Sequence, residues 1–180
     1  MSAVTEWMRT AGATIKAETH ALPPEWFIWE AYVSTRRLQR RRRHRGPLSL
    51  PPPYKWDGRA PRTASSAAAA ASAAHQVLRH HFPRAAPRLD AALADTLAKI
   101  PDGEAEDEGV AFGRLAAEHI VALRRDDGRG ASVPFPVRPR PGVWRPTPPG
   151  HESFASAWVG RVRPLLLDSP HQFRPGPPPP

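Results

Sequence analysis

The chain has 180 residues, a formal net charge of +9, 24 prolines, 12 glycines and no cysteine. This length suffices for one domain with a real core, while the proline content indicates that a sizeable part lies outside regular helix or sheet. Without cysteine, the chain has neither a disulfide framework nor a thiolate nucleophile or metal site. It contains no run of about 18 apolar residues and no apolar secretion signal, which predicts a soluble protein, cytoplasmic by default.

The positive charge is concentrated in one segment, residues 36–45. Seven of its ten residues are arginines: Arg36, Arg37, Arg40, Arg41, Arg42, Arg43 and Arg45. Subtracting these seven charges from +9 leaves a net charge of +2 for the other 170 residues. Such a run can attract nucleic-acid phosphates through counterion release, or an anionic lipid surface. A solvated, self-repelling surface segment is the alternative that we favour.

The first 62 residues are expected to form an arm that is separate from the main body. Apolar residues at helical spacing predict a short amphipathic helix over residues 25–39, after Pro23 and Pro24. Five prolines in residues 46–62 then indicate an irregular connector.

Residues 63–128 are predicted to form a three-helix bundle. The first helix begins after Ser65 or Ser66 as N-cap and ends before Pro83. Its small and apolar residues share one face, which predicts close helix packing and an alanine-rich surface that associates if it is exposed: Ala67, Ala70, Ala71, Ala74, Val77, Leu78 and Phe82.

The second helix starts near Pro87, carries a stripe of Leu89, Leu93, Leu97 and Ile100, and ends at Pro101. The third covers about residues 104–125, with an acidic first turn that suits the helix dipole and Gly128 as a stop signal. Its predicted packing face comprises Val110, Gly113, Ala117, Ile120 and Val121, with the closest approach at Gly113. The short connections predict an antiparallel, all-α arrangement.

Residues 129–180 are predicted to form a long extended segment, because 14 of the 24 prolines lie in residues 131–180. Residues 153–167 allow a helical turn or two, interrupted by Pro164. Large apolar side chains are expected to anchor the segment: Trp144, Phe154, Trp158, Leu166 and Phe173.

Five sequence blocks follow one another along the chain: AASAAHQVLRHHFP (residues 70–83), IPDG (100–103), EDEGVAFGRLAAEHIVALRRDDG (106–128), PGVWRPTPP (141–149) and QFRPGPPPP (172–180). Over about residues 64–180 this series resembles the bacterial vanadium-dependent haloperoxidase-like proteins of the type 2 phosphatidic acid phosphatase superfamily. The first 60 residues depart from the family pattern, which has a small-residue helix with an Asp-Ala pair where this chain has the arginine run.

The resemblance implies an all-helical protein that binds vanadate, or a substrate phosphate in the phosphatase relatives. The family holds this oxyanion with K-x6-R-P, P-S-G-H and S-R-x5-H motifs, which follow the QFRP-type segment. Because this chain ends there, it is expected to be the N-terminal scaffold, without catalytic, cofactor-binding or metal residues and inactive alone, with a C-terminal half or a self-associating copy as partner. The complete protein would oxidise halides with peroxide or hydrolyse phosphomonoesters.

Two segments approach these motifs. Lys55 and Arg62 have the spacing of the first, but Thr63 replaces its proline. Residues 148–151 (PPGH) match the second except that Pro149 replaces serine, removing a hydroxyl donor. Both stand in the wrong order relative to the other blocks, so we interpret them as coincidences.

Other candidate residues favour structural roles. His75, His80 and His81 are expected to be solvated or capping, since neither cysteine nor a helical His-x3-His pair supports a zinc site, and His119 is expected in the core or a groove. The carboxylates of Glu104, Glu106, Asp107 and Glu108 suggest helix-dipole stabilisation more than a cation site.

Overall fold

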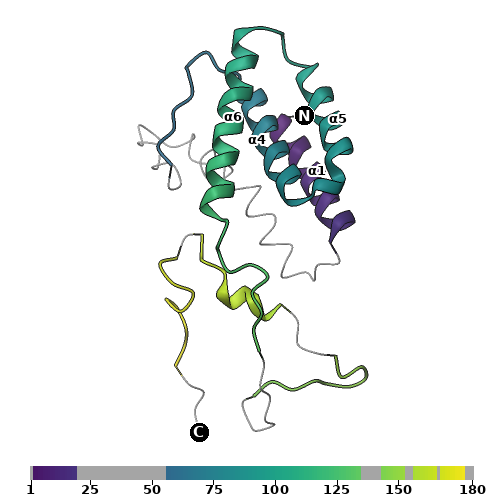
Figure 1. Cartoon of the computed structure of the whole chain (residues 1–180), viewed down its shortest axis with the longest axis vertical. Coiled ribbons are helices and arrows are strands. Elements are labelled where there is room, and N and C mark those ends of the chain that lie inside the picture. Colours follow the sequence, from purple (N-terminus) through teal and green to yellow (C-terminus); the bar gives the residue numbers. More distant parts are fainter. Residues whose placement is uncertain (1, 20–55, 135–142, 153–155, 166, 177–180) are drawn as a thin grey trace. The chain divides into compact units, whose positions relative to one another are not determined.

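The computed structural model describes residues 2–19, 56–134, 143–152, 156–165 and 167–176, which divide into two compact units, Met1–Arg124 and Arg125–Pro180. In these ranges all regular secondary structure is helical: α1 (Ala3–Glu18), α4 (Ser66–His81), α5 (Ala86–Leu97), α6 (Glu104–Leu123), and the 3-10 helices η1 (Pro83–Ala85) and η2 (Ala157–Arg161). The expected all-α class is confirmed (Figure 1).

Helix α4 is the central element of the first unit. The Ser65 side chain caps it by accepting a hydrogen bond from the Ala68 amide at 3.2 Å, as predicted. The helix contacts α1, α5 and α6, so burial extends around it and is not confined to one face: Ala68, Ala69, Ala71, Ser72, Ala73, His75, Val77 and Leu78 are buried. The alanine-rich surface is therefore covered by neighbouring helices of the same chain.

Helices α4 and α6 approach closely where α6 has glycine. A Cβ on Gly113 would lie 2.5 Å from the Ala69 carbonyl oxygen and 2.8 Å from the Ser72 Cβ, which confirms the predicted close packing at this residue. Gly109, one turn earlier, has the same role without having been predicted: its Cβ would lie 2.5 Å from the Ser65 carbonyl oxygen. Only glycine leaves room for the backbones at these two positions.

The direction of α6 relative to α4 follows from the expected antiparallel order of consecutive helices. The Ser65 amide donates to the Ala105 carbonyl oxygen at 2.7 Å, and the Ser72 hydroxyl donates to the Val110 carbonyl oxygen at 3.0 Å. Since both helices advance together between these two links, α4 and α6 are parallel neighbours. Consecutive helices are antiparallel, as expected, because the short turns on either side of α5 reverse the chain.

Helix α1 was not predicted, and it belongs to the same compact unit as the bundle. Trp7, Ala11 and Ile15 lie on one face of α1 and join the core formed with α4, η1 and α5. The residues expected to form a separate arm therefore contribute a fourth helix to the described part of the bundle. The helix predicted over residues 25–39 and the arginine run lie outside the described residues.

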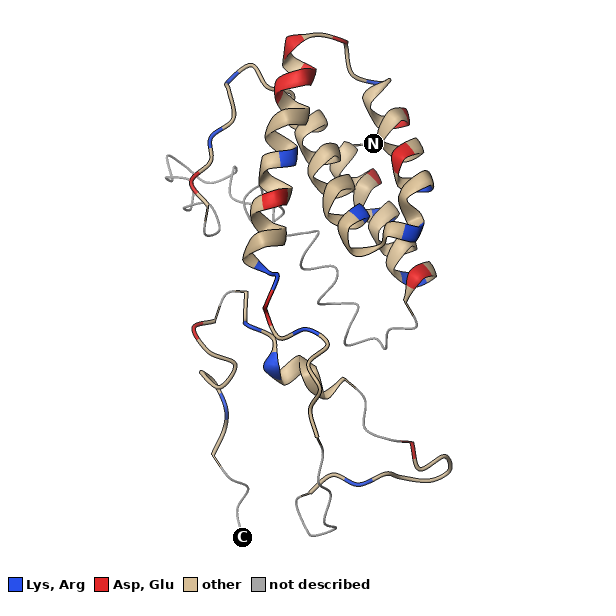
Figure 2. Ribbon diagram, in the orientation of Figure 1, with Lys and Arg blue, Asp and Glu red and all other residues tan. Residues whose placement is uncertain are grey.

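The starts of α5 and α6 follow the sequence signals. Pro87 lies in the first turn of α5, and Leu89 is fully buried. Helix α5 ends at Leu97, before the predicted Ile100. Helix α6 starts after Gly103 with Glu104, Glu106 and Asp107 in its first turn, where carboxylates face the positive end of the helix dipole; Figure 2 shows this acidic turn.

The second unit contains η2 inside the range where a helical turn was expected. Gly128 adopts φ +90°, and the Arg163 amide donates to the Asp127 carbonyl oxygen at 2.7 Å. The side chains of Trp144 and Phe173 are 47% and 77% exposed, and the expected anchoring of this segment stays a prediction. Phe154 and Leu166 lie outside the described residues.

No helix in the described ranges is long and apolar enough to cross a membrane.

We predict that Gly113→Ala destabilises the first unit. Overpacking costs about 1–3 kcal/mol, and the clash is with α4 backbone, which cannot rotate away; the gain in helix propensity, up to ~1 kcal/mol, offsets only part of this. Gly12→Ala is the matched control, because no atom lies within 4 Å of a Cβ at this position of α1. Urea unfolding should show reduced stability for Gly113→Ala only. Equal stabilisation by both substitutions would contradict the close approach.

Candidate functional site

A cluster of three polar side chains links α4 to α5. The Nε2 atom of His75 lies 2.7 Å from the Oδ1 atom of Asp90, and the guanidinium of Arg79 donates to the same oxygen at 2.8 Å. His75 and Arg79 are one turn apart on α4, so their side chains reach the same point on α5. His75 is buried, while the side chains of Asp90 and Arg79 are 46% and 51% exposed.

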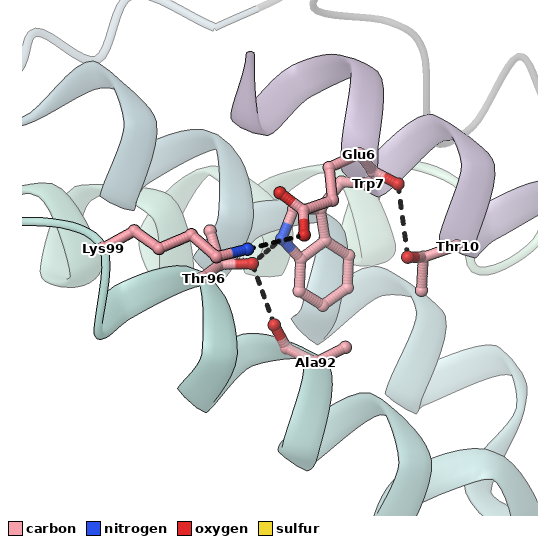
Figure 3. Close-up of polar contacts among 6 residues, drawn as sticks. All are labelled: Glu6, Trp7, Thr10, Ala92, Thr96 and Lys99. Carbon is pink, nitrogen blue, oxygen red and sulfur yellow. Dashed lines mark hydrogen bonds and ion pairs between the residues drawn. The ribbon is translucent and has the colours of Figure 1, made fainter. Parts of the chain in front are cut away.

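Helix α1 closes the buried side of this cluster. The Trp7 ring meets His75 edge-on, with ring centroids 6.2 Å apart and an interplanar angle of 84°. Its indole N–H donates to the Thr96 hydroxyl at 3.2 Å, and that hydroxyl donates to the Ala92 carbonyl oxygen at 2.8 Å (Figure 3). The indole therefore has a polar partner in an otherwise apolar contact, as a buried tryptophan requires.

The electrostatic consequence falls on Asp90. The hydrogen bond from His75 is the main cause that lowers the pKa of Asp90 below its ordinary value; desolvation opposes this, and the positive charge of Arg79 adds to the lowering. A lowered pKa means that the folded state keeps the carboxylate ionised at a pH where the unfolded chain has begun to bind the proton. The interaction therefore stabilises the fold above about pH 4 and is lost as the pH falls through the lowered pKa.

The position of His75 corrects the expectation of a solvated or capping residue. It is a buried histidine whose Nε2 is paired with a carboxylate, and the partner residues Asp90 and Trp7 were not predicted. A His–Asp pair orients an imidazole in many catalytic sites, but those sites also need a nucleophile within hydrogen-bond reach. The nearest hydroxyl along α4, Ser72, donates to the Val110 carbonyl oxygen. The pair of His75 and Asp90 therefore links α4 to α5.

The other predicted histidines lie apart from this cluster. His80 is exposed and meets the ring of His81 edge-on, with centroids 4.8 Å apart. His119 is half-buried on α6 and stacks on Trp56 at 5.7 Å, while Phe112 stacks on the same indole at 5.2 Å. Trp56 thus lies along two turns of α6, and His119 is half-buried against its ring.

The two near-matches to oxyanion motifs belong to different units, and the structure describes all of their named residues except Lys55. Arg62 is exposed, and Lys55 lies outside the described residues. The neighbouring Thr63 hydroxyl donates to the Glu108 carboxylate at 2.6 Å. Gly150 and His151 are exposed in a turn in which the His151 amide donates to the Thr147 carbonyl oxygen at 3.1 Å, and the Pro148–Pro149 peptide is cis.

The acidic turn of α6 does not gather into a cation site. Among the described residues no group of three or more histidine, aspartate or glutamate side chains is placed to hold a metal ion. Glu108 instead links the start of α6 to the segment that precedes α4. This arrangement agrees with the helix-dipole interpretation of these carboxylates.

Comparison of the chain with protein-family models, curated proteins and solved structures finds no match.

We predict that Asp90→Asn removes part of the acid sensitivity of the fold. The asparagine retains a polar side chain but has no carboxylate to keep ionised, so the wild-type advantage over the variant should be full above about pH 4 and shrink as the pH falls further. Asp95→Asn, on the exposed side of the same helix, is the control. Urea unfolding of the three proteins between pH 2.5 and pH 7 measures the difference. A wild-type advantage that is independent of pH would contradict the assignment.

Proposed function

We propose that this chain is the N-terminal helical scaffold of a vanadium-dependent haloperoxidase-like protein of the type 2 phosphatidic acid phosphatase superfamily. The observation that carries the proposal is the ordered series of sequence blocks between residues 70 and 180, from the small-residue helix to the two proline-rich segments. In the resembled family these blocks precede the motifs that hold the oxyanion. The proposal rests on this resemblance.

The close packing of the first unit is consistent with a structural scaffold. Gly109 and Gly113 bring α6 against the α4 backbone, and such close contacts suit a rigid framework. The titratable side chains that cluster between α4 and α5 bond to one another and link the two helices: His75, Asp90 and Arg79. They hold the bundle together and have no separate reacting group within the contacts they make.

The described residues of the two near-matches do not fit vanadate. A trigonal-bipyramidal oxyanion needs several fixed donors and one imidazole. Arg62 and His151 are both exposed, and Pro149 has no hydroxyl or amide hydrogen to donate. The scaffold proposal therefore assigns oxyanion binding to residues that are absent from this sequence and assigns no chemical step to this chain.

Halide oxidation and phosphomonoester hydrolysis use the same oxyanion cradle, so the phosphatase is the alternative within the family. We expect the 180-residue chain, incubated with vanadate, hydrogen peroxide and bromide, to brominate a phenolic reporter no faster than the buffer does. Phosphate release from a phosphomonoester should likewise stay at background. Turnover by the purified chain in either assay would contradict the proposal.

The coding sequence beyond the Pro180 codon provides an independent test. In-frame K-x6-R-P, P-S-G-H and S-R-x5-H motifs would support the scaffold proposal, and their absence would remove its basis.

A non-catalytic basic module is the second candidate, favoured by the seven arginines in residues 36–45. If this run binds duplex DNA, changing Arg40, Arg41, Arg42 and Arg43 to Gln should make the slope of log K against log salt less negative by about 3–4, since each phosphate contact contributes ~0.9. The control changes four exposed arginines elsewhere: Arg59, Arg62, Arg84 and Arg114. Fluorescence anisotropy at several salt concentrations measures both slopes. Equal slopes would reject the module.

A further inference from the structure

We propose that the groove between α4 and α5, which holds α1, is a docking site that also accepts α1 from a second copy of this chain. The two copies would exchange their first helices and form a symmetric dimer. The inference concerns an interaction surface and is independent of the proposed enzymatic family. It rests on the chemistry of the α1 contact and on the length of chain between α1 and α4.

The middle of the groove receives one large aromatic anchor. Trp7 is 2% exposed, its ring edge contacts His75, and its N–H is satisfied by Thr96. Ala11 and Ile15 continue the same face of α1 into the core. A single buried tryptophan with a matched polar partner is the typical anchor of a helix bound in a groove.

The two ends of the groove carry cations that match carboxylates on α1. Lys99 lies 2.9 Å from Glu6 (Figure 3), and Arg88 lies 3.9 Å from Glu18. Glu6 and Glu18 are twelve residues apart on α1, about 18 Å along its axis. Arg88 lies near the start of α5, and Lys99 lies two residues beyond its end. The antiparallel match fixes both the direction and the register of the bound helix.

The Arg88 end also makes a polar contact to the buried side of α1. Its guanidinium donates to the Thr14 hydroxyl at 3.4 Å, and that hydroxyl donates to the Thr10 carbonyl oxygen at 2.8 Å. Thr14 is fully buried. The groove therefore recognises a defined pattern, an amphipathic helix with a tryptophan near its start and an acidic residue at each end.

The connection between α1 and α4 is long. Residues 19–65 follow α1 and precede α4, and a chain of 47 residues can span up to about 155 Å when extended. The α1 helix of a second copy can therefore reach the groove with the same contacts that the chain's own α1 makes. The choice between them depends on the protein concentration relative to the effective concentration at which the chain presents its own α1 to the groove.

Charge exchange between two full-length variants tests this proposal. One variant carries Glu6→Lys and Glu18→Lys, and the other carries Arg88→Glu and Lys99→Glu. Each alone places like charges at both ends of its own groove. In a mixture, the lysine-bearing α1 matches the glutamate-bearing groove, and the other pairing is the natural one. Native mass spectrometry at tens of micromolar should show a 1:1 heterodimer at least tenfold tighter than either homodimer.

The control pair reverses charges at exposed positions outside the groove, Asp95→Lys with Glu118→Lys against Arg84→Glu with Arg114→Glu. Equal dimerisation of this pair would show general charge attraction and overturn the proposal. A mixture of the groove variants that stays monomeric, while each keeps wild-type helicity by circular dichroism, would also overturn it.

If a groove variant loses its helicity, the wild-type chain serves as the test. Sedimentation from 10 μM to 1 mM should show a growing dimer fraction that Trp7→Ala abolishes. A wild-type chain that is monomeric at 1 mM, or a dimer that persists with Trp7→Ala, would reject exchange of α1.

Discussion

The fold of the first unit depends on the close contact between the α4 and α6 backbones. A Cβ on Gly113 would lie 2.5 Å from the Ala69 carbonyl oxygen, so α6 can hold this position only where it has no side chain. The same contact makes Ser72 useful, because its hydroxyl reaches the Val110 carbonyl oxygen across the interface. Close approach increases the number of dispersion contacts per residue, which compensates for the small apolar area of alanine. Because α4 has neighbouring helices on several sides, it needs small side chains such as alanine over most of its surface.

Because α4 is surrounded, the polar residues on it must find partners on neighbouring helices. His75 faces α5 and α1, where water is excluded, and an unpaired imidazole there would lose its hydrogen bonds to solvent. Asp90 supplies the partner from the edge of the groove, where its second oxygen can remain hydrated. A buried histidine paired with a half-exposed carboxylate is therefore a packing solution first, and it also sets the acid sensitivity of the α4–α5 contact.

The helices from Ser66 to Leu123 could be predicted from sequence because their ends carry local signals. Ser65 caps α4, Pro83 and Pro87 mark the turn into α5, and the acidic residues mark the start of α6. Helix α1 has a cap at Ser2 and Trp7, Ala11 and Ile15 at intervals of four, a signal that was available but weak, since two of its four buried residues are alanine and threonine. The parallel direction of α4 and α6 follows from the two short connections, whereas their hydrogen bonds to each other could not be read from the spacing of residues.

The cluster around His75 could not be predicted, because its partners lie on different helices and hydrogen bonding depends on how those helices rotate. Gly113 was predicted as a close-contact residue because it falls within the apolar face of α6, whereas Gly109 was not included in that face.

The oxyanion motifs present the opposite case. Their spacing is read directly from the sequence, and the near-matches at residues 55–63 and 148–151 lack a residue that the chemistry requires.

The two largest contacts of α4 with other helices differ in kind. The α6 contact joins backbones and buries small side chains, and a connection of six residues keeps α6 beside α5. The α1 contact is made by side chains: the Trp7 ring meets His75 of α4, while the Trp7–Thr96 hydrogen bond and two ion pairs join α1 to α5 and the residues just after it. In sequence, 47 residues separate α1 from α4. Exposed ion pairs contribute little, typically 0–1 kcal/mol, so Trp7 and its apolar neighbours carry most of the α1 contact. Since proteins open first where buried contacts are fewest, α1 should leave the bundle before α6 does, and the groove it vacates is the surface on which a second helix of the same pattern can bind.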